Sequence, residues 1–200
     1  MTNARKMTCT VELEGSLKRG DAELTSLTFR RPETPALIDL SLVQLGQMNV
    51  DELRKLLPRI SADGLIAEEV DKLGADDMLL IAREISTFMD KGETVERDDD
   101  ADADAPRKMN TTAMLSVPIA REGSTALDKL ELRRPDAGAL RNLSLSDVGQ
   151  LQVRALLTLL PRICTEKLTR KDLLKIDFAD WMEIAGEVGD FLLPRRLRTA

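Results

Sequence analysis

Near its start the chain alternates hydrophobic and polar residues with the period of two that is typical of half-buried strands. We expect a first strand over Thr8–Glu14, a turn region around Gly15–Gly20, and a second strand over Glu23–Arg30. In the second strand, Leu27 and Phe29 would share the buried face because alternate side chains of a strand point the same way. The pattern therefore predicts a β-hairpin.

The same pattern returns in the second half of the chain. It predicts strands over Ala113–Ile119 and Leu127–Arg133, joined by a turn at residues 121–124. Pro32 and Pro135 follow the second strand of each pair, and because proline has no N–H for a strand ladder, we expect the strands to end there.

After each hairpin, apolar residues recur with helical spacing. In the second half we expect a helix capped by Ser144 or Ser146 with Leu145, Val148 and Leu151 on one side, a helix over Val153–Ile163, a helical turn over Thr169–Leu174, and a last helix from near Asp177 to Leu192. The last helix would carry an apolar face that includes Trp181, which we interpret as a core residue.

The two halves align without a gap at an offset of 103 residues. Leu24–Met89 and Leu127–Leu192 each contain 66 residues, and 26 of the aligned positions are identical. A constant offset over this length is typical of internal duplication. We therefore predict an α+β protein of two tandem copies of a small module, each with an N-terminal β-hairpin followed by about three helices.

An acidic segment separates the copies. Residues 91–108 contain seven acidic and four basic residues and few apolar ones, which favours an extended, flexible tether. The predicted organisation is a disordered lead-in (1–6), module 1 (7–90), an acidic flexible linker (91–111), module 2 (112–193) and a basic tail (194–200).

The charge and composition narrow the class of protein. A net charge of −6 argues against nucleic-acid binding, which needs a positive face, and no apolar run is long enough to span a membrane. The polar N-terminus lacks the core of a signal peptide, and Cys9 and Cys164 do not correspond between the copies. We expect a cytosolic protein with two ordinary thiols.

Catalytic and metal-binding motifs are poorly supported. Asp98, Asp100 and Asp102 match the first positions of an EF-hand loop, but Ala103 and Met109 stand where the loop needs Gly and Glu. The chain has no His and no nucleophile or phosphate-loop motif, and the acids at the helix starts are explained as caps and helix-dipole partners. We predict no enzyme, no cofactor and no metal.

The repeated Arg-Arg-Pro is the most specific surface signal, and two interpretations stay open. The arginines either carry solvated charge that protects a strand edge, or they clamp an acidic helix or the module's own helix-start acids. We expect partner binding at the double arginines and at one helix face, that is at Arg30, Arg31, Arg133, Arg134, Leu156, Leu159, Leu160 and Ile163.

The order of motifs resembles a known family. The second copy runs from a short hairpin (Leu115–Ile119, Leu127–Leu132) into Arg-Arg-Pro, a Leu-rich helix, the turn Leu168–Asp172 and a helix ending at Val188–Phe191. This series resembles the tail assembly chaperones of contractile-tailed bacteriophages, the Mu-like group. Copy one departs from it at Gly64 and Gly74-Ala75, and the tandem arrangement is a further departure.

The resemblance implies a non-enzymatic role in the host cell cytoplasm. Such proteins bind the tape measure protein, keep it soluble, help to recruit tail-tube subunits, and are absent from the mature virion. Two tethered modules would add avidity along a repetitive client, and self-association is compatible with the sequence. The alternatives are a structural tail or baseplate component retained in the virion, a carboxylate-based hydrolase or transferase, and an unrelated cytosolic adaptor.

Overall fold

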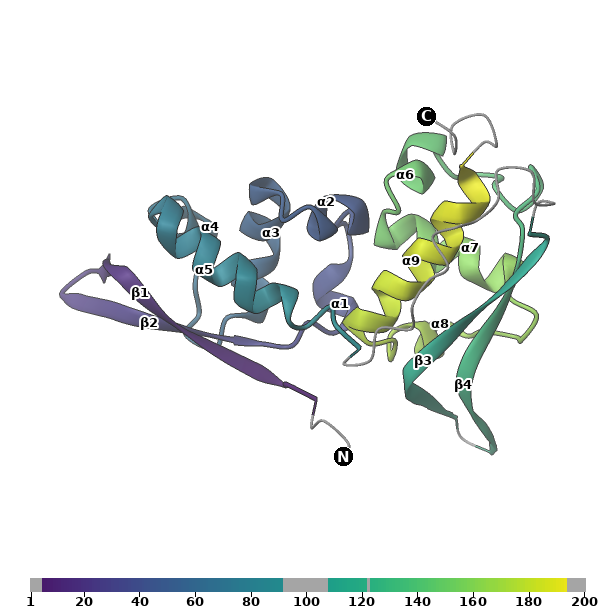
Figure 1. The fold of residues 1–200 in the computed structure, drawn as a ribbon, viewed down its shortest axis with the longest axis horizontal. Helices are drawn as coiled ribbons and strands as arrows, with labels where there is room; N and C mark the ends of the chain where they lie inside the picture. Colours follow the sequence, from purple (N-terminus) through teal and green to yellow (C-terminus); the bar gives the residue numbers. More distant parts are fainter. Residues whose placement is uncertain (1–4, 92–107, 122, 194–200) are drawn as a thin grey trace.

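The computed structural model describes residues 5–91, 108–121 and 123–193. It contains two antiparallel β-hairpins, each followed by helices, which confirms the α+β class and the tandem repeat (Figure 1). The hairpins lie toward opposite ends of the molecule and the helices lie between them. The predicted linker lies mostly outside the described residues, and so do the basic tail and residues 1–4 of the predicted lead-in.

The elements of the two modules correspond closely. Module 1 contains β1 (Thr8–Arg19), β2 (Ala22–Arg30), α1 (Thr34–Leu37), α2 (Leu42–Gly46), α3 (Val50–Ile60), α4 (Ala67–Val70) and α5 (Ala75–Ser86). Module 2 contains β3 (Asn110–Arg121), β4 (Ser124–Arg133), α6 (Leu145–Gly149), α7 (Val153–Ile163), α8 (Arg170–Leu173) and α9 (Phe178–Leu192). The helix bounds predicted for 153–163 agree with α7, and β3 begins two residues before the predicted start of module 2.

The first strand of each hairpin is longer than the sequence pattern indicates. β1 continues through the predicted turn region to Arg19, and the chain reverses instead at Gly20, whose φ of 61° suits glycine. The strand pairing shifts register between Glu12 and Leu17, so the alternation of buried side chains is interrupted there. This irregularity is why the stretch resembled a turn in the sequence.

Aspartates at the start of the last helices compensate for these irregularities. In module 1 the Glu14 amide, at the register shift, donates to Asp77 Oδ1 at 2.7 Å. In module 2 the Ser116 amide donates to Asp180 Oδ1 at 2.7 Å and the Val117 amide to Asp180 Oδ2 at 3.3 Å. These acids therefore join helix to strand, a role beyond the capping that we predicted for them.

The arginine of the repeated Leu-Leu-Pro-Arg-Ile motif secures the loop that follows each hairpin. Arg59 Nη1 donates to the carbonyl oxygens of Ala36 at 2.8 Å and Ile38 at 2.7 Å. Arg162 makes the equivalent pair of bonds in module 2, both at 2.7 Å. Each guanidinium thus satisfies two carbonyls of irregular backbone, which explains why the motif occurs in both copies.

Aliphatic side chains form the core. Leu27 and Phe29 of β2 are fully buried against the helices, as the alternation predicted. Ser144 caps α6 by accepting from the Asp147 amide, again as predicted. The predicted apolar side of that helix needs a correction, because Leu145 is 73% exposed.

Candidate functional site

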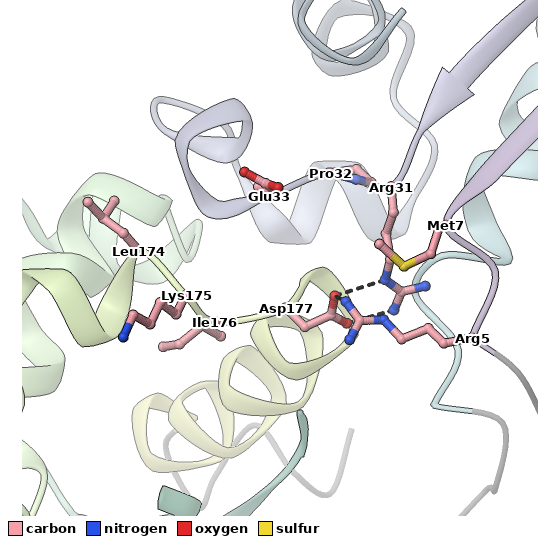
Figure 2. Close-up of a pocket in the computed structure, with 9 residues that line it drawn as sticks. All are labelled: Arg5, Met7, Arg31, Pro32, Glu33, Leu174, Lys175, Ile176 and Asp177. Atoms are coloured by element: carbon pink, nitrogen blue, oxygen red, sulfur yellow. Dashed lines mark hydrogen bonds and ion pairs between the residues drawn. The ribbon is translucent and has the colours of Figure 1, made fainter. Parts of the chain in front are cut away.

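The second arginine of the module 1 pair, Arg31, lies where the two modules meet. Arg31 is almost fully buried, and its guanidinium donates from Nε to Asp177 Oδ2 at 2.8 Å and from Nη2 to Asp177 Oδ1 at 2.6 Å (Figure 2). Arg5 also forms an ion pair with this carboxylate. A two-point contact of this kind is among the stronger polar interactions in proteins. Arg31 therefore clamps a helix-start acid, as one of our interpretations expected, but the acid belongs to the other module.

The pair is electrostatically coupled. Burial alone would raise the pKa of the Asp177 carboxyl, but the hydrogen bonds and positive charge of Arg31 hold that pKa below its usual value. Asp177 also caps α9 by accepting from the Ala179 amide at 3.0 Å. The Arg31 guanidinium lies 5.8 Å from the centre of the Phe88 ring, which adds a cation–π contact.

A pocket of about 330 Å³ opens beside this ion pair, as Figure 2 shows. It is lined by residues from both modules, namely Arg5, Met7, Arg31, Pro32, Glu33, Leu174, Lys175, Ile176 and Asp177. Its mixture of charged and apolar side chains suits contact with a polypeptide surface better than it suits a buried small molecule.

A second polar contact buries the one tryptophan of the chain. Trp181 Nε1 donates to Thr34 Oγ1 at 2.8 Å, and both side chains are fully buried. The Thr34 hydroxyl in turn lies 2.8 Å from the Ile176 carbonyl oxygen and 3.1 Å from that of Leu173. Trp181 is a buried residue, as predicted, but part of its environment comes from module 1.

Backbone hydrogen bonds complete the contact between modules. The Leu42 amide donates to the Leu151 carbonyl at 3.3 Å, and the Val153 amide donates to the Leu40 carbonyl at 3.0 Å. Ser41 Oγ donates to the Gln150 carbonyl at 2.7 Å. Sequence reasoning missed this contact, because the internal alignment pairs equivalent positions and does not show which different positions meet.

The arginines of module 2 have different surroundings. Arg134, the counterpart of Arg31, is half-buried and has no ion-pair partner among the described residues. The position equivalent to Asp177 in module 1 is Gly74. Arg30 and Arg133 are exposed. Arg133 Nη2 donates to the Arg162 carbonyl at 2.8 Å.

The four apolar residues predicted for partner binding lie in the core. Leu156, Leu159, Leu160 and Ile163 on α7 have no exposed surface. A partner could reach them only if module 2 opened. The accessible part of the predicted site therefore consists of Arg30, Arg133 and the half-buried Arg134.

The remaining chemistry of the described residues is limited. They hold no group of three or more His, Cys, Asp or Glu side chains placed to bind a metal. The Cys164 thiol has a pKa raised to about 12 by burial and by its hydrogen bond to Glu166, so it is a poor nucleophile near neutral pH. Within the same residues, no helix has the length and apolar character needed to cross a membrane.

Comparison with known proteins places this repeated module in a family. The family model described as phage tail assembly chaperone proteins, E, or 41 or 14, matches twice, at residues 10–90 and 112–193. Because these matches cover most of the chain, it belongs to that family, and each module is one family unit. No solved structure matches the chain.

Two proteins of Escherichia phage P2 are similar to parts of the chain. Tail assembly protein E is 33% identical over 84 residues, which are 42% of this chain and 91% of that protein. Tail assembly protein E′ is 34% identical over 79 residues, which are 40% of this chain and 55% of that protein. Protein E is thus about the length of one module, whereas this chain carries two. The expected family is confirmed, and the assignment to a Mu-like group stays a prediction.

Proposed function

We propose that the protein binds the tape measure protein during phage tail assembly, keeps it soluble and helps to recruit tail-tube subunits. The observation that carries this proposal is a repeated surface of exposed methionine beside the double arginine. Met7 is 58% exposed and Met109 is 66% exposed. Their carbonyl oxygens accept from the amides of Arg31 and Arg134 at 2.7 Å, so both methionines have the same position in their modules.

This surface has the chemistry that a helical client needs. Methionine is unbranched and polarizable, so it adapts to irregular apolar stripes, and the neighbouring Arg30 and Arg133 are exposed and can pair with acids beside such a stripe. A long helical protein with exposed apolar stripes aggregates unless they are covered. Two such surfaces in one chain give bivalent contact with a repetitive client, which strengthens binding without new kinds of contact.

Co-expression with the tape measure protein of the same phage tests the proposal. We expect the client to stay soluble and to co-purify with the wild-type chain, and to precipitate when the chain is omitted. The double charge reversal R30E/R133E should reduce the recovered complex severalfold. Lys18→Glu, a charge reversal at another exposed strand position, should leave it unchanged.

An insoluble client with no co-purification would contradict the proposal.

We further propose that the protein acts in the host cytoplasm and is absent from the finished particle. Mass spectrometry of purified virions tests this point, because a retained tail or baseplate component would be present there in a fixed ratio to the tube subunit.

A further inference from the structure

The contact between the modules joins two different surfaces, and each surface exists twice. We call residues 31–42 of module 1 and 134–145 of module 2 the loop face. We call residues 48–50 with 73–79 of module 1, and 151–153 with 176–182 of module 2, the helix face. Inside the molecule the loop face of module 1 binds the helix face of module 2. The loop face of module 2 and the helix face of module 1 do not meet each other among the described residues, and we call them the unused faces.

The burial of equivalent residues shows the difference. On the loop face Leu42 is 1% exposed, whereas its counterpart Leu145 is 73% exposed. On the helix face Val153 is fully buried, whereas its counterpart Val50 is 61% exposed. Eight large apolar side chains are exposed among the described residues, and Val50, Leu79 and Leu145 among them lie on the unused faces.

We propose that these unused faces bind each other between copies of this chain, with the loop face of module 2 on the helix face of module 1 of the next copy. A contact between two different surfaces does not close on itself as a two-fold contact does, so it generates a ring or an open string of copies. The occupant of each exposed face is therefore a second copy of the same protein.

The backbone of the unused faces is already set for this contact. Leu151 has the uncommon φ of 50° and accepts from the Leu42 amide, and Met48, at the equivalent position, has a φ of 53°. A positive φ of this size strains the backbone of residues other than glycine, asparagine and aspartate. The amides of Val50 and Leu145 have no backbone partner outside their own helices among the described residues.

A carboxylate is available for Arg134 even though Gly74 has no side chain. A Cβ atom placed on Gly74 would lie 2.3 Å from Asp76 Oδ1. The Asp76 carboxylate of module 1 therefore lies close to the position that the Cβ atom of Asp177 has in module 2. The Asp76 side chain is exposed. In the proposed contact Asp76 takes the role that Asp177 has for Arg31.

Other pairs change together in a compatible way. The buried polar pair of Thr34 and Trp181 becomes Ala137 and Met78, so a hydrogen-bonded pair is replaced by two apolar side chains. The exposed ion pair between Asp39 and Arg154 becomes Asn142 and Asp51, an amide donor facing a carboxylate. Ser41, whose hydroxyl donates to the Gln150 carbonyl of module 2, has a serine at its equivalent position, residue 144.

The packing of the helices offers a further match. A Cβ atom placed on Gly46 would lie 3.3 Å from the terminal methyl of Met182, so α9 approaches α2 closely. A Cβ atom placed on the equivalent Gly149 would have no other described residue within 4 Å. Leu79, the counterpart of Met182, is 73% exposed and would fill this space in the next copy.

Sedimentation velocity of the purified chain alone, without any client, tests the proposal over a hundredfold range of concentration. We expect the mean mass to rise above the 22.2 kDa of one chain as concentration increases. Leu145→Asp and Val50→Asp should each remain at the mass of one chain. Both substitutions replace exposed side chains, so the fold should persist, which far-UV circular dichroism checks.

Mixing the two variants gives the sharpest result. The V50D chain keeps an intact loop face on module 2, and the L145D chain keeps an intact helix face on module 1. These two faces can bind each other once, so an equimolar mixture should form pairs of twice the single mass. Met114→Asp is the matched control, because Met114 is 55% exposed on β3, away from both faces, and should associate as the wild type does.

A wild-type chain that stays monomeric throughout would overturn the proposal. So would variants that associate as the wild type does, or a mixture that forms no pairs. Because no client is present, these outcomes are separate from the failure of tape measure binding.

Discussion

At the scale of single residues, the same arginine has two different environments. Arg31 is buried against Asp177, whereas Arg134 is half-buried and has no ion-pair partner among the described residues. The difference arises because Arg31 lies against the helix face of module 2, whereas no described helix face lies against Arg134. A buried arginine depends on its carboxylate, because removing one partner leaves the other charge uncompensated.

The Arg31–Asp177 pair predicts how stability depends on pH. The pKa of Asp177 is lower in the folded chain than in the unfolded chain, where it is about 3.9. The pair therefore stabilises the folded state above about pH 4. This contribution is lost as the pH falls through the folded pKa. Asp177→Asn should lower the free energy of unfolding by about 3 kcal/mol at pH 7 and by less near pH 3.

Urea unfolding at pH 7, 5, 4 and 3 measures this dependence. Asp39→Asn is the control, because Asp39 pairs with Arg154 on the surface and solvent screens that pair. The prediction fails if both variants lose the same stability at pH 7, or if the difference between wild type and Asp177→Asn does not shrink in acid.

At the scale of elements, an acid in the first turn of each last helix joins that helix to an irregular strand. Asp180 has no exposed surface and accepts two strand amides, whereas Asp77 accepts one. The register shift removes ladder partners from these amides, and the carboxylates replace them. Helix and strand are therefore positioned together in each module.

Removing this carboxylate should destabilise module 2. Asp180→Ala leaves the amides of Ser116 and Val117 without their acceptor, which should lower the free energy of unfolding by about 2 kcal/mol. Amide hydrogen exchange should accelerate over residues 114–119 in particular. Asp147→Ala, at an exposed acid of α6, should change neither quantity, and equal effects of the two substitutions would contradict the prediction.

At the scale of the whole molecule, the buried contact makes the two modules one structural unit. Arg31, Thr34 and Ser41 of module 1 all bond to groups of module 2. We expect the modules to unfold in a single transition, because neither keeps its buried polar groups satisfied without the other.

Two probes of unfolding test this coupling. Fluorescence of the single Trp181 reports on the contact, and far-UV circular dichroism reports on both modules. Their midpoints in urea should coincide in the wild type. Thr34→Val leaves Trp181 Nε1 without its acceptor and should shift both midpoints to lower urea by the same amount. Separate midpoints in the wild type would show that the modules unfold independently.

Sequence patterns predicted the repeat, the fold class and the bounds of α7, because the apolar spacing of Val153–Ile163 is regular. The extent of β1 was wrong because a register shift interrupts its alternation. A contact of Arg31 with a helix-start acid was one of two open interpretations, and it placed that acid in the same module as the arginine. Its location required the three-dimensional arrangement, since the two residues are 146 positions apart.

The way in which the loop face meets the helix face gives the molecule a direction. Two equal modules related by a two-fold axis would present the same surface at both ends. Here one unused face carries Val50 and Leu79 and the other carries Leu145, so the two unused faces differ chemically. A ligand that contacts both unused faces can therefore bind in only one orientation. The duplication that produced two similar halves has thus produced a molecule with a direction.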